Sequence, residues 1–293
     1  MIVIRIQLLV FGALLLAACS STSLIYNNAS WFIESQIDDY FSLNNDQEES
    51  LGQALDEFFQ WHRTRELPGY ADALERLSVD LSDGLERSEL QAFFIDINDA
   101  RLRLVEQVAQ PASAFLVTVG ESQLEQFDAE FQEQIDERAK ELERSPDESA
   151  EARFEGFLDQ LEGWFGEFND SQKARIREIS DAWPDRSDYW LEVRRQRHKQ
   201  FMQLMRADPT ETEIAQYIRD RFIHRRFSTD QELATIERSR AEWIDALLEV
   251  DSLLTSLQRR RAISEMQDYR DDFRELSQED VADKRASAAG VDN

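Results

Sequence analysis

The sequence predicts an all-α protein built of many helices. Glycine and proline, which most often interrupt helices, are scarce, with 9 and 5 among 293 residues. Apolar residues recur three and four positions apart through most of the chain, and no long stretch alternates apolar and polar residues as a strand would. A chain of this length can form one large domain or two smaller ones.

Residues 1–18 are expected to be a signal peptide rather than part of the fold. Arg5 precedes an apolar run over residues 6–16, which is too short for a comfortable transmembrane helix. The run leads into Ala17, Ala18 and Cys19, and small residues followed at once by cysteine resemble the bacterial lipobox. Cleavage between Ala18 and Cys19 would make Cys19 the first residue of the mature chain.

The lipobox resemblance implies a lipid anchor on Cys19. It implies a thioether-linked diacylglycerol and an N-acyl chain, such as palmitate, and several acyl chains together anchor a protein stably. Ser20 at the next position resembles lipoproteins that are sorted to the outer membrane of Gram-negative bacteria. The alternative is an ordinary secretory signal followed by a chance cysteine. Cys19 is the only cysteine, so no internal disulfide can form. We expect residues 19–23 to tether the protein to the periplasmic side of the outer membrane.

The charge of the chain is strongly negative. The formal net charge is −27, from 60 acidic and 33 basic residues, and the acidic excess is concentrated in residues 19–150. Nucleic acid and bare anionic membrane surfaces are therefore poor partners, whereas basic protein clients would be attracted. The alternative is that the acidic residues only solvate the surface and keep the protein soluble.

Basic residues gather in four short runs in the second half. We interpret the runs as partners of neighbouring acidic helices, and alternatively as contacts for the headgroups of the inner leaflet of the outer membrane. They are Arg194-Arg195, Arg197-His198-Lys199, Arg225-Arg226 and Arg259-Arg260-Arg261.

Residues 24–145 are expected to form a first helical unit. Apolar residues at helical spacing predict helices around residues 33–40, 51–62, 70–81, 94–108 and 124–142. Leu67-Pro68-Gly69 is expected to break the helix between the second and third of these stretches, and Pro111 to end or kink the fourth. Ser145 and Pro146 mark the expected end of the unit.

Residues 146–276 are expected to form a second helical unit. The same spacing predicts helices around residues 154–165, 176–183, 190–205, 214–222, 233–247 and 263–276. Thr210 and Glu213 have the spacing of a capping box at the start of one of these helices. Residues 277–293 are polar and small, and we expect them to be disordered.

One short phrase opens several of these helices: an apolar residue, a capping residue, two further residues and a glutamine. Asn or Thr at the cap accepts a bond from a first-turn N–H, and the glutamine reaches back to the N–H of the cap. Two phrases fall in each expected unit, which favours two tandem copies of one unit; the alternative is chance in a chain of capped helices. The phrases are Leu43-Asn44-Asn45-Asp46-Gln47, Val119-Gly120-Glu121-Ser122-Gln123, Phe168-Asn169-Asp170-Ser171-Gln172 and Leu254-Thr255-Ser256-Leu257-Gln258.

The phrase that starts at Leu254 matches the Leu-Thr-x-x-Gln motif of periplasmic stress chaperones and adaptors of the Spy and CpxP type. In that type the motif occurs twice in each cradle-shaped, all-helical unit. The resemblance implies binding of periplasmic client proteins without catalysis. Those chaperones are basic around the surface that binds their client proteins, whereas this chain is acidic. The resemblance therefore does not extend to the range of clients that they bind.

A second resemblance covers most of the chain after Cys19. The residues that carry it are Tyr26-Asn27-Asn28, Trp31, Asp38-Asp39-Tyr40, Trp61-His62-Arg63, Glu66-Leu67-Pro68 and Tyr70. Together with the lipobox they resemble a family of predicted bacterial lipoproteins with no assigned function, which implies a location but no activity. We interpret His62, its neighbours and Glu66 as a polar network that ties a helix end to Tyr70, or alternatively as a contact for a partner.

The sequence contains no pattern that predicts catalysis or metal binding. None of His62, His198 and His224 lies in a Glu-x-x-His or His-Glu-x-x-His arrangement, and there is no glycine-rich phosphate loop. We therefore expect no catalytic residue, no metal and no cofactor. The predicted function is chaperone-like or adaptor-like binding of periplasmic proteins by a lipid-anchored chain; the alternative is a structural or assembly scaffold with one dedicated envelope partner.

Overall fold

The computed structural model describes residues 21–278, and this part of the chain is helical almost throughout, without a strand. The all-α, multi-helix fold is therefore confirmed. The expected cleavage site at Ala18 and Cys19 and residues 279–293 of the expected tail lie outside the described residues. Ser277 and Gln278, which the sequence also predicts to belong to the disordered tail, are instead the last residues of α13. The elements are α2 (Ser21–Asn27), α3 (Ala29–Phe41), α4 (Asn45–Trp61), η2 (His62–Glu66), α5 (Leu67–Asp83), α6 (Arg87–Leu116), α7 (Glu121–Leu142), α8 (Pro146–Phe165), α9 (Asp170–Asp181), α10 (Ser187–Met205), α11 (Glu211–Phe222), α12 (Asp230–Leu253) and α13 (Ser256–Gln278).

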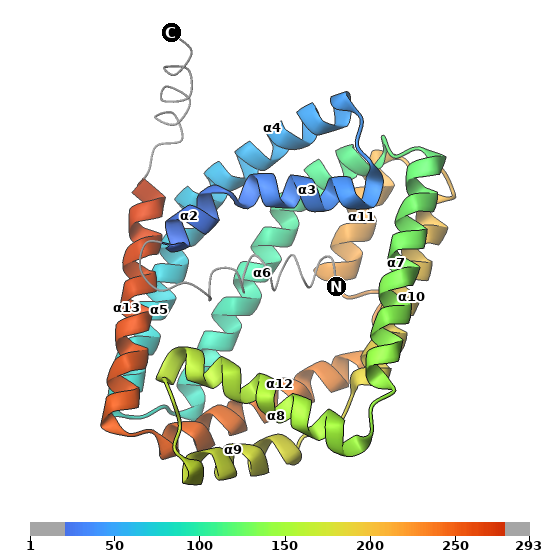
Figure 1. Cartoon of the computed structure of the whole chain (residues 1–293). Helices are drawn as coiled ribbons and strands as arrows, with labels where there is room; N and C mark the ends of the chain where they lie inside the picture. Colours follow the sequence, from blue (N-terminus) through green and yellow to red (C-terminus); the bar gives the residue numbers. More distant parts are fainter. Residues whose placement is uncertain (1–20, 279–293) are drawn as a thin grey trace.

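The helices are arranged as a four-sided frame (Figure 1). In the view of Figure 1, α3 and α4 form the upper side, α7 and α10 the right side, α8, α9 and α12 the lower side, and α5 and α13 the left side. Helix α6 crosses the frame behind these elements. The helix pairs with the most extensive contact are α5 with α13, α6 with α11, α7 with α10 and α8 with α9. The first three pairs each join one helix from residues 24–145 to one from residues 146–276.

Buried apolar residues form several small clusters rather than one core. One cluster joins Tyr26 and residues of α4 and α5 to Phe273 and Leu276 of α13. Another joins residues of α3 and α7 to Leu191 and Ile214. Two further clusters lie among α8, α9 and α12 and between α5 and α13. The two expected units therefore share buried clusters, and each supplies part of the packing of the other.

The helix from α4 to α5 is continuous, and the break expected at Leu67-Pro68-Gly69 does not occur. The chain passes instead through η2, a π-helical turn in which the N–H of Leu67 bonds to the carbonyl oxygen of His62, five residues back. Pro68 then lies in the first turn of α5, where its missing N–H is tolerated. A wider turn therefore takes the place of a break, and π turns of this kind are frequent at functional sites.

Pro111 does not end its helix either, because α6 continues from Arg87 to Leu116. A proline inside a helix removes one backbone hydrogen bond and costs about 3 kcal/mol. On either side of Pro111, Ala109 and Ser113 are fully buried, and α6 packs along α11 and against α4. This packing offsets the cost of the proline and keeps the helix intact.

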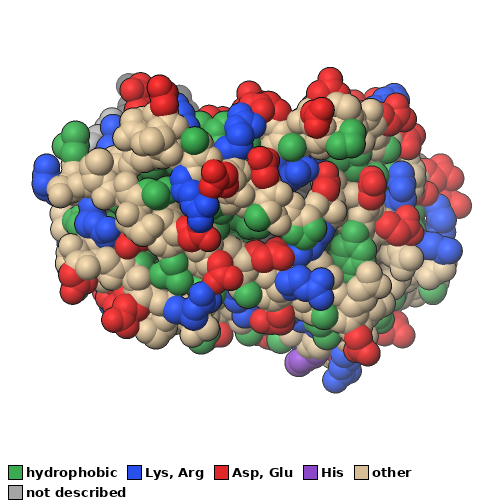
Figure 2. Space-filling view, turned by 90° about the horizontal axis from the view of Figure 1, so that it is seen from below, with side chains coloured by type: hydrophobic (Ala, Val, Ile, Leu, Met, Phe, Trp, Pro, Cys, Tyr) green, Lys and Arg blue, Asp and Glu red, His purple; other side chains and the backbone are tan. Residues whose placement is uncertain are grey.

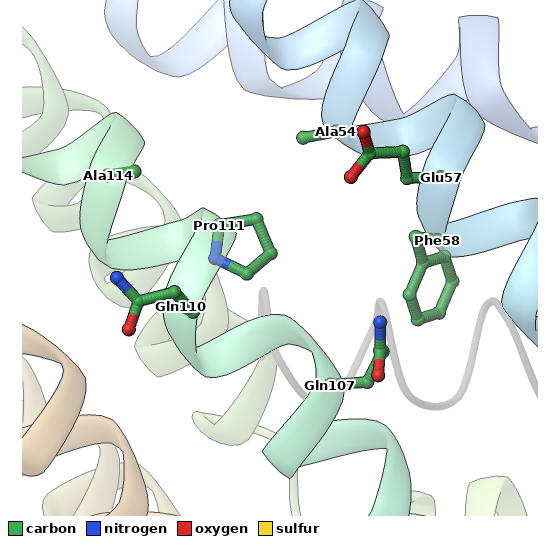
Figure 3. Close-up of a pocket in the computed structure, with 7 residues that line it drawn as sticks. All are labelled: Ala54, Glu57, Phe58, Gln107, Gln110, Pro111 and Ala114. Atoms are coloured by element: carbon green, nitrogen blue, oxygen red, sulfur yellow. The ribbon is translucent and has the colours of Figure 1, made fainter.

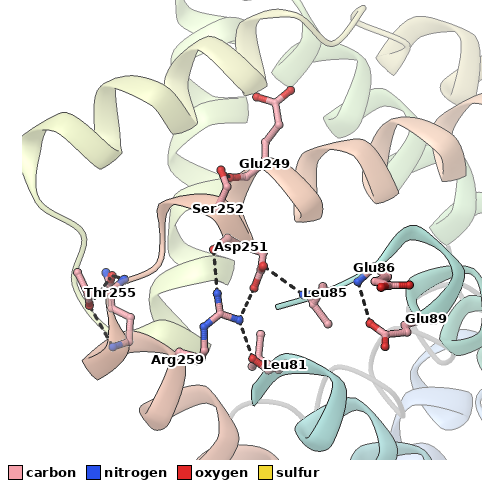
Figure 4. Close-up of polar contacts among 10 residues, drawn as sticks. Leu81, Leu85, Glu86, Glu89, Glu249, Asp251, Ser252, Thr255 and Arg259 are labelled. Atoms are coloured by element: carbon pink, nitrogen blue, oxygen red, sulfur yellow. Dashed lines mark hydrogen bonds and ion pairs between the residues drawn. The ribbon is translucent and has the colours of Figure 1, made fainter. Parts of the chain in front are cut away.

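A polar corner ties the turn between α5 and α6 to the turn between α12 and α13 (Figure 4). The guanidinium of Arg259 donates to the carbonyl oxygen of Leu81 (2.6 Å) and to the carboxylate of Asp251 (2.7 Å). The same carboxylate accepts from the N–H of Leu85 at 3.2 Å. Gly84 makes this tight turn with a φ of +107°, which a side chain would strain. The corner therefore joins a turn inside the first expected unit to a turn inside the second.

Candidate functional site

The four capping phrases meet in two pairs. The side-chain amides of Gln47 and Gln123 bond to each other at 2.7 and 3.2 Å, although the residues lie 76 positions apart. Gln172 and Gln258 bond to each other in the same way, at 2.9 and 3.4 Å. We call these pairs the first and second glutamine clasps. Each clasp joins the starts of two helices, α4 with α7 and α9 with α13.

Each glutamine also donates to the backbone of the opposite phrase. The acceptor is always the carbonyl oxygen of the residue just before the apolar position of that phrase. These bonds run from Gln47 to Thr118 (3.2 Å), from Gln123 to Ser42 (3.3 Å), from Gln172 to Leu253 (2.7 Å) and from Gln258 to Glu167 (3.0 Å). The pattern of bonds is thus the same in both clasps, which the spacing of the phrases along the sequence does not reveal.

The glutamines cap their own helices at the same time. The oxygen of Gln172 accepts from the N–H of Asn169 at 3.0 Å, while the Asn169 side chain accepts from the N–H of Gln172 at 3.1 Å. Asn44 with Gln47 and Thr255 with Gln258 form the same reciprocal boxes. The apolar residues Leu43, Phe168 and Leu254 pack into the buried clusters, and Phe168 is fully enclosed. Amide groups are not reactive at neutral pH, so the clasps fasten helices rather than perform chemistry.

Most of the residues that carry the second resemblance converge on the π turn. The hydroxyl of Tyr26 and Nδ1 of His62 form a hydrogen bond of 2.8 Å, and Arg63 bonds to the side-chain oxygen of Asn27. The Arg63 guanidinium also lies 4.9 Å from the centre of the Tyr26 ring. The ring of Tyr70 meets the ring of His62 edge-on at 5.5 Å. Residues from α2, η2 and α5 therefore form one polar and aromatic network.

Burial governs the protonation of this network. It lowers the pKa of His62 to about 4, and the nearby charge of Arg63 acts in the same direction. It raises the pKa of both Tyr26 and Tyr70 well above the usual value, and Glu66 adds to the effect at Tyr70. His62 is therefore neutral at pH 7, and its buried Nε2 has no hydrogen-bond partner among the described residues.

Glu66 links the network to α6. Its carboxylate is 2% exposed and accepts two parallel hydrogen bonds from Arg103, at 2.8 and 2.9 Å. This bidentate pair raises the pKa of the Arg103 guanidinium, chiefly through the hydrogen bond. Sequence reasoning missed Arg103. A signal existed, because Arg101 and Arg103 are the only basic residues between Arg87 and Arg138.

The remaining residues of the second resemblance lie at the edge of the network or away from it. Asn28 precedes α3 without capping it through its side chain, and Trp31 is 69% exposed on α3. Trp61 ends α4, where its ring lies 6.4 Å from that of His62. Pro68 lies in the first turn of α5. Trp31 is therefore the large hydrophobic member whose exposure the network does not explain.

An open groove runs between α4 and α6 next to the π turn (Figure 3). It consists of a hollow of about 260 Å³ and a neighbouring one of about 480 Å³, and Gln107 lines both. In Figure 3, Ala54, Glu57 and Phe58 of α4 face Gln107 and Pro111 of α6 across the first hollow, whereas the amide of Gln110 points away from α4 and bonds to Glu211 of α11. We call this surface the α4–α6 groove; its lining residues are Ala54, Glu57, Phe58, Trp61, Arg65, Glu66, Arg103, Glu106, Gln107, Gln110, Pro111 and Ala114.

His198 and several arginines of the basic runs make packing and ion-pair contacts, whereas His224 is exposed. His198 stacks on Phe131 with ring centres 3.9 Å apart and bonds to Asp128 at 2.6 Å. Burial lowers the pKa of His198, against the effect of Asp128. The expected pairing of the basic runs with acidic residues is confirmed for four arginines: Arg195 with Glu192, Arg197 with Glu232, Arg226 with Asp220 and Arg259 with Asp251.

Two further properties of residues 21–278 bear on function. None of their helices combines the length and hydropathy needed to cross a bilayer. No group of three or more histidine, cysteine or acidic side chains within this part of the chain is placed to hold a metal ion.

Comparison with known proteins identifies one family. No curated protein and no solved structure matches the chain. The model of a family of unknown function, DUF6279, matches residues 39–222, a segment that runs from the end of α3 to the end of α11. The matched segment contains the π turn with His62 and Glu66, Arg103, the whole α4–α6 groove and three of the four clasp glutamines. Because the match covers more than half of the sequence, the chain belongs to the DUF6279 family.

Proposed function

We propose that this chain is a lipid-anchored protein of the cell envelope, without catalytic activity, that holds a segment of one dedicated protein partner in the α4–α6 groove. The lipobox around Cys19 supports the anchor and the location on the periplasmic side of the outer membrane. The groove is the observation that carries the binding function, because it is the open hollow that borders the buried network of the π turn.

The lining of the groove suits an extended peptide segment. The amide of Gln107 can bond to a peptide backbone, and Phe58, Trp61 and Pro111 offer apolar contacts. Glu57 is exposed at the groove, and the net charge of −27 attracts basic segments. The expected ligand is therefore an extended segment that carries apolar and basic side chains.

The walls of the groove are held in place before any ligand binds. The Glu66–Arg103 ion pair fastens η2 to α6, and His62, on the same turn, is fully enclosed. A preformed surface loses little conformational freedom on binding, which favours a specific partner.

The distribution of exposed hydrophobic side chains favours a dedicated partner over broad client binding. Those that are most exposed, Trp31, Val79, Ile95 and Leu257, lie on four different helices. On the face that Figure 2 shows, acidic and basic side chains alternate and hydrophobic ones are scattered between them. A chaperone that binds unfolded clients is expected to present a larger contiguous apolar surface.

A chaperone-like function is the second candidate, and the glutamine clasps favour it. Each clasp pairs two phrases that resemble the Leu-Thr-x-x-Gln motif. In proteins of the Spy and CpxP type that motif also occurs twice in each helical unit. The equal bonding pattern of the clasps also supports two tandem units, residues 24–145 and 146–276, as copies of one ancestral unit.

Site-specific crosslinking in cells tests the binding function. A photoreactive benzoylphenylalanine replaces Gln107 in the full chain, and we expect one dominant crosslinked partner in the envelope fraction. Ala54→Trp fills the groove and should remove that product, whereas Val79→Trp, at an exposed position of α5, should leave it unchanged. A synthetic peptide of the crosslinked segment should bind the purified protein at least tenfold more weakly after Ala54→Trp.

Three outcomes would contradict the proposal. A broad spread of crosslinked proteins would establish the chaperone-like function instead. A product that survives Ala54→Trp would place the binding surface elsewhere, and the absence of any product at Gln107 would remove the groove as a binding site. The anchor is tested separately: Cys19→Ala should abolish acyl labelling and release the protein from the membrane fraction, and persistent labelling would show that Cys19 is not the lipidated residue.

A further inference from the structure

Three large hydrophobic side chains near the start of the described chain point away from the core. Ile25 in α2 and Trp31 and Phe32 in α3 are 38%, 69% and 44% exposed. On the same helices, Tyr26 is buried and Ala29 packs against the cluster that Tyr26 belongs to. Helices α2 and α3 therefore have one apolar side in the core and exposed apolar residues on the other.

The stretch that carries these residues has no charge. No acidic or basic residue occurs from Ser20 to Ile33, in a chain of which 32% of the residues are charged. Single exposed hydrophobic residues are ordinary on protein surfaces. An uncharged stretch with three of them is unusual here, and of the six tryptophans Trp31 is the only one that is exposed; the other five are at least partly buried. Burial in a protein core does not account for this side chain.

We propose that Ile25, Trp31 and Phe32 form a seating surface that lies in the headgroup layer of the phospholipid bilayer to which Cys19 is anchored. This inference rests on the proposed lipid anchor. Ile25 lies six positions after Cys19, so even an extended chain holds Ile25 within about 20 Å of the acyl chains. Tryptophan is enriched at the depth of the headgroups, where its ring contacts apolar matter and its N–H stays hydrated.

We assign a membrane rather than a protein to the seating surface for two reasons: the surface lies close to the anchor along the chain, and the stretch that forms it carries no charge. The anchor delivers α2 and α3 to the bilayer at high local concentration, so weak contacts suffice. The absence of charge between Ser20 and Ile33 removes the repulsion that the acidic remainder of the chain would meet at an anionic lipid surface. The seating surface would fix the orientation of the frame on the membrane, which a flexible tether alone does not.

Depth-dependent fluorescence quenching tests the seating surface. The chain from Cys19 onward, which contains every described residue, is attached through the Cys19 thiol to maleimide-bearing vesicles of phosphatidylethanolamine and phosphatidylglycerol, three to one, whose acyl chains are brominated near the headgroup. This chemical tether makes the result independent of whether cells lipidate Cys19. Attachment should quench the tryptophan emission by roughly one sixth, the share of one exposed tryptophan among six. Trp31→Leu should remove that quenching without changing the helical circular dichroism.

A displaced tryptophan provides the matched control. Leu257 is 70% exposed at the start of α13, whereas α2 packs near the other end of that helix, against Phe273 and Leu276. The combined variant Trp31→Leu and Leu257→Trp should show no quenching after attachment. Equal quenching at position 257 would mean that the protein lies on the bilayer without a preferred face, and a wild-type chain quenched no more than Trp31→Leu would overturn the seating surface. Failure of the Cys19→Ala test in cells would instead overturn the anchor alone.

Discussion

The two glutamine clasps share the same amide and carbonyl bonds, to which the first adds a bond from Gln47 to the Thr118 hydroxyl at 3.0 Å, but they differ in burial and in capping. In the second clasp, both Gln172 and Gln258 are 6% exposed, and their helices are capped by side chains. In the first clasp Gln47 is buried, whereas Gln123 is only partly buried and its cap position holds Gly120, which has no side chain to accept a bond. The bonding pattern therefore depends on the glutamines and loop carbonyls, and the caps add stability without setting the geometry.

The difference indicates that the second clasp contributes more to the fold. Neither clasp joins helices that pack side by side, since α4 with α7 and α9 with α13 are absent from the closely packed pairs. These helix starts are instead linked by the amide bonds and by the apolar residues of the phrases, which pack into shared buried clusters. A buried amide that loses its partner costs more than an exposed one, because water cannot replace the lost bond. The two clasps should respond differently to the same substitution.

Removing one glutamine from each clasp gives the largest expected effect. Gln258→Ala deletes the bonds to Gln172, to the carbonyl of Glu167 and to the N–H of Thr255, and leaves buried groups without partners. We expect a loss of about 4 kcal/mol in the free energy of unfolding, against about 1 to 2 kcal/mol for Gln123→Ala. Urea unfolding of both variants in a Cys19→Ala chain measures the difference. Equal losses would show that burial does not distinguish the clasps.

Acid should weaken the side of the molecule that carries the first clasp. Helix α4 begins at the first clasp and leads directly into His62, whose pKa burial lowers from 6.5 to about 4. Below pH 6.5 the unfolded chain binds a proton that the folded chain excludes, so stability falls as the pH drops. By pH 4 the loss should reach about 3 kcal/mol.

Comparing wild type with His62→Leu isolates this contribution from that of the many acidic residues. Between pH 6.5 and 4, the free energy of unfolding of His62→Leu should fall by less than that of the wild type, by the amount that His62 contributes. This holds whatever the stability of the variant at pH 7. Hydrogen exchange at pH 5 should show faster exchange in α4 and α5 of the wild type than in α9 and α12, which share no buried cluster with them. Parallel pH profiles for the two proteins would exclude His62 as the cause.

Local features of the fold could be predicted from the sequence, whereas contacts between distant residues could not. Helical periodicity predicts the all-α fold, and the spacing of three residues from Asn169 to Gln172 predicts a capping box, because both depend on neighbours along the chain. The bond between Gln172 and Gln258 spans 86 positions and leaves no local trace. Pro68 signals a break by the same local rules, but the π turn before it lets the helix continue. The groove and the Glu66–Arg103 pair depend on how α4 and α6 pack, which no short window of sequence encodes.

The smallest expected effect would make the first clasp more like the second. The backbone at Gly120 is extended with a φ of −79°, which any residue can adopt, and an added Cβ would lie no closer than 4.0 Å to Gln123. Gly120→Asn should therefore supply the missing cap and raise the free energy of unfolding by a few tenths of a kcal/mol. Gly84→Asn is the opposite control, because the positive φ there strains a side chain and the variant should be destabilised. Both are measured by urea unfolding. A higher free energy of unfolding for Gly120→Asn would show that the missing cap limits the stability of the first clasp. An unchanged value would instead attribute the weakness of the first clasp to the partial exposure of Gln123.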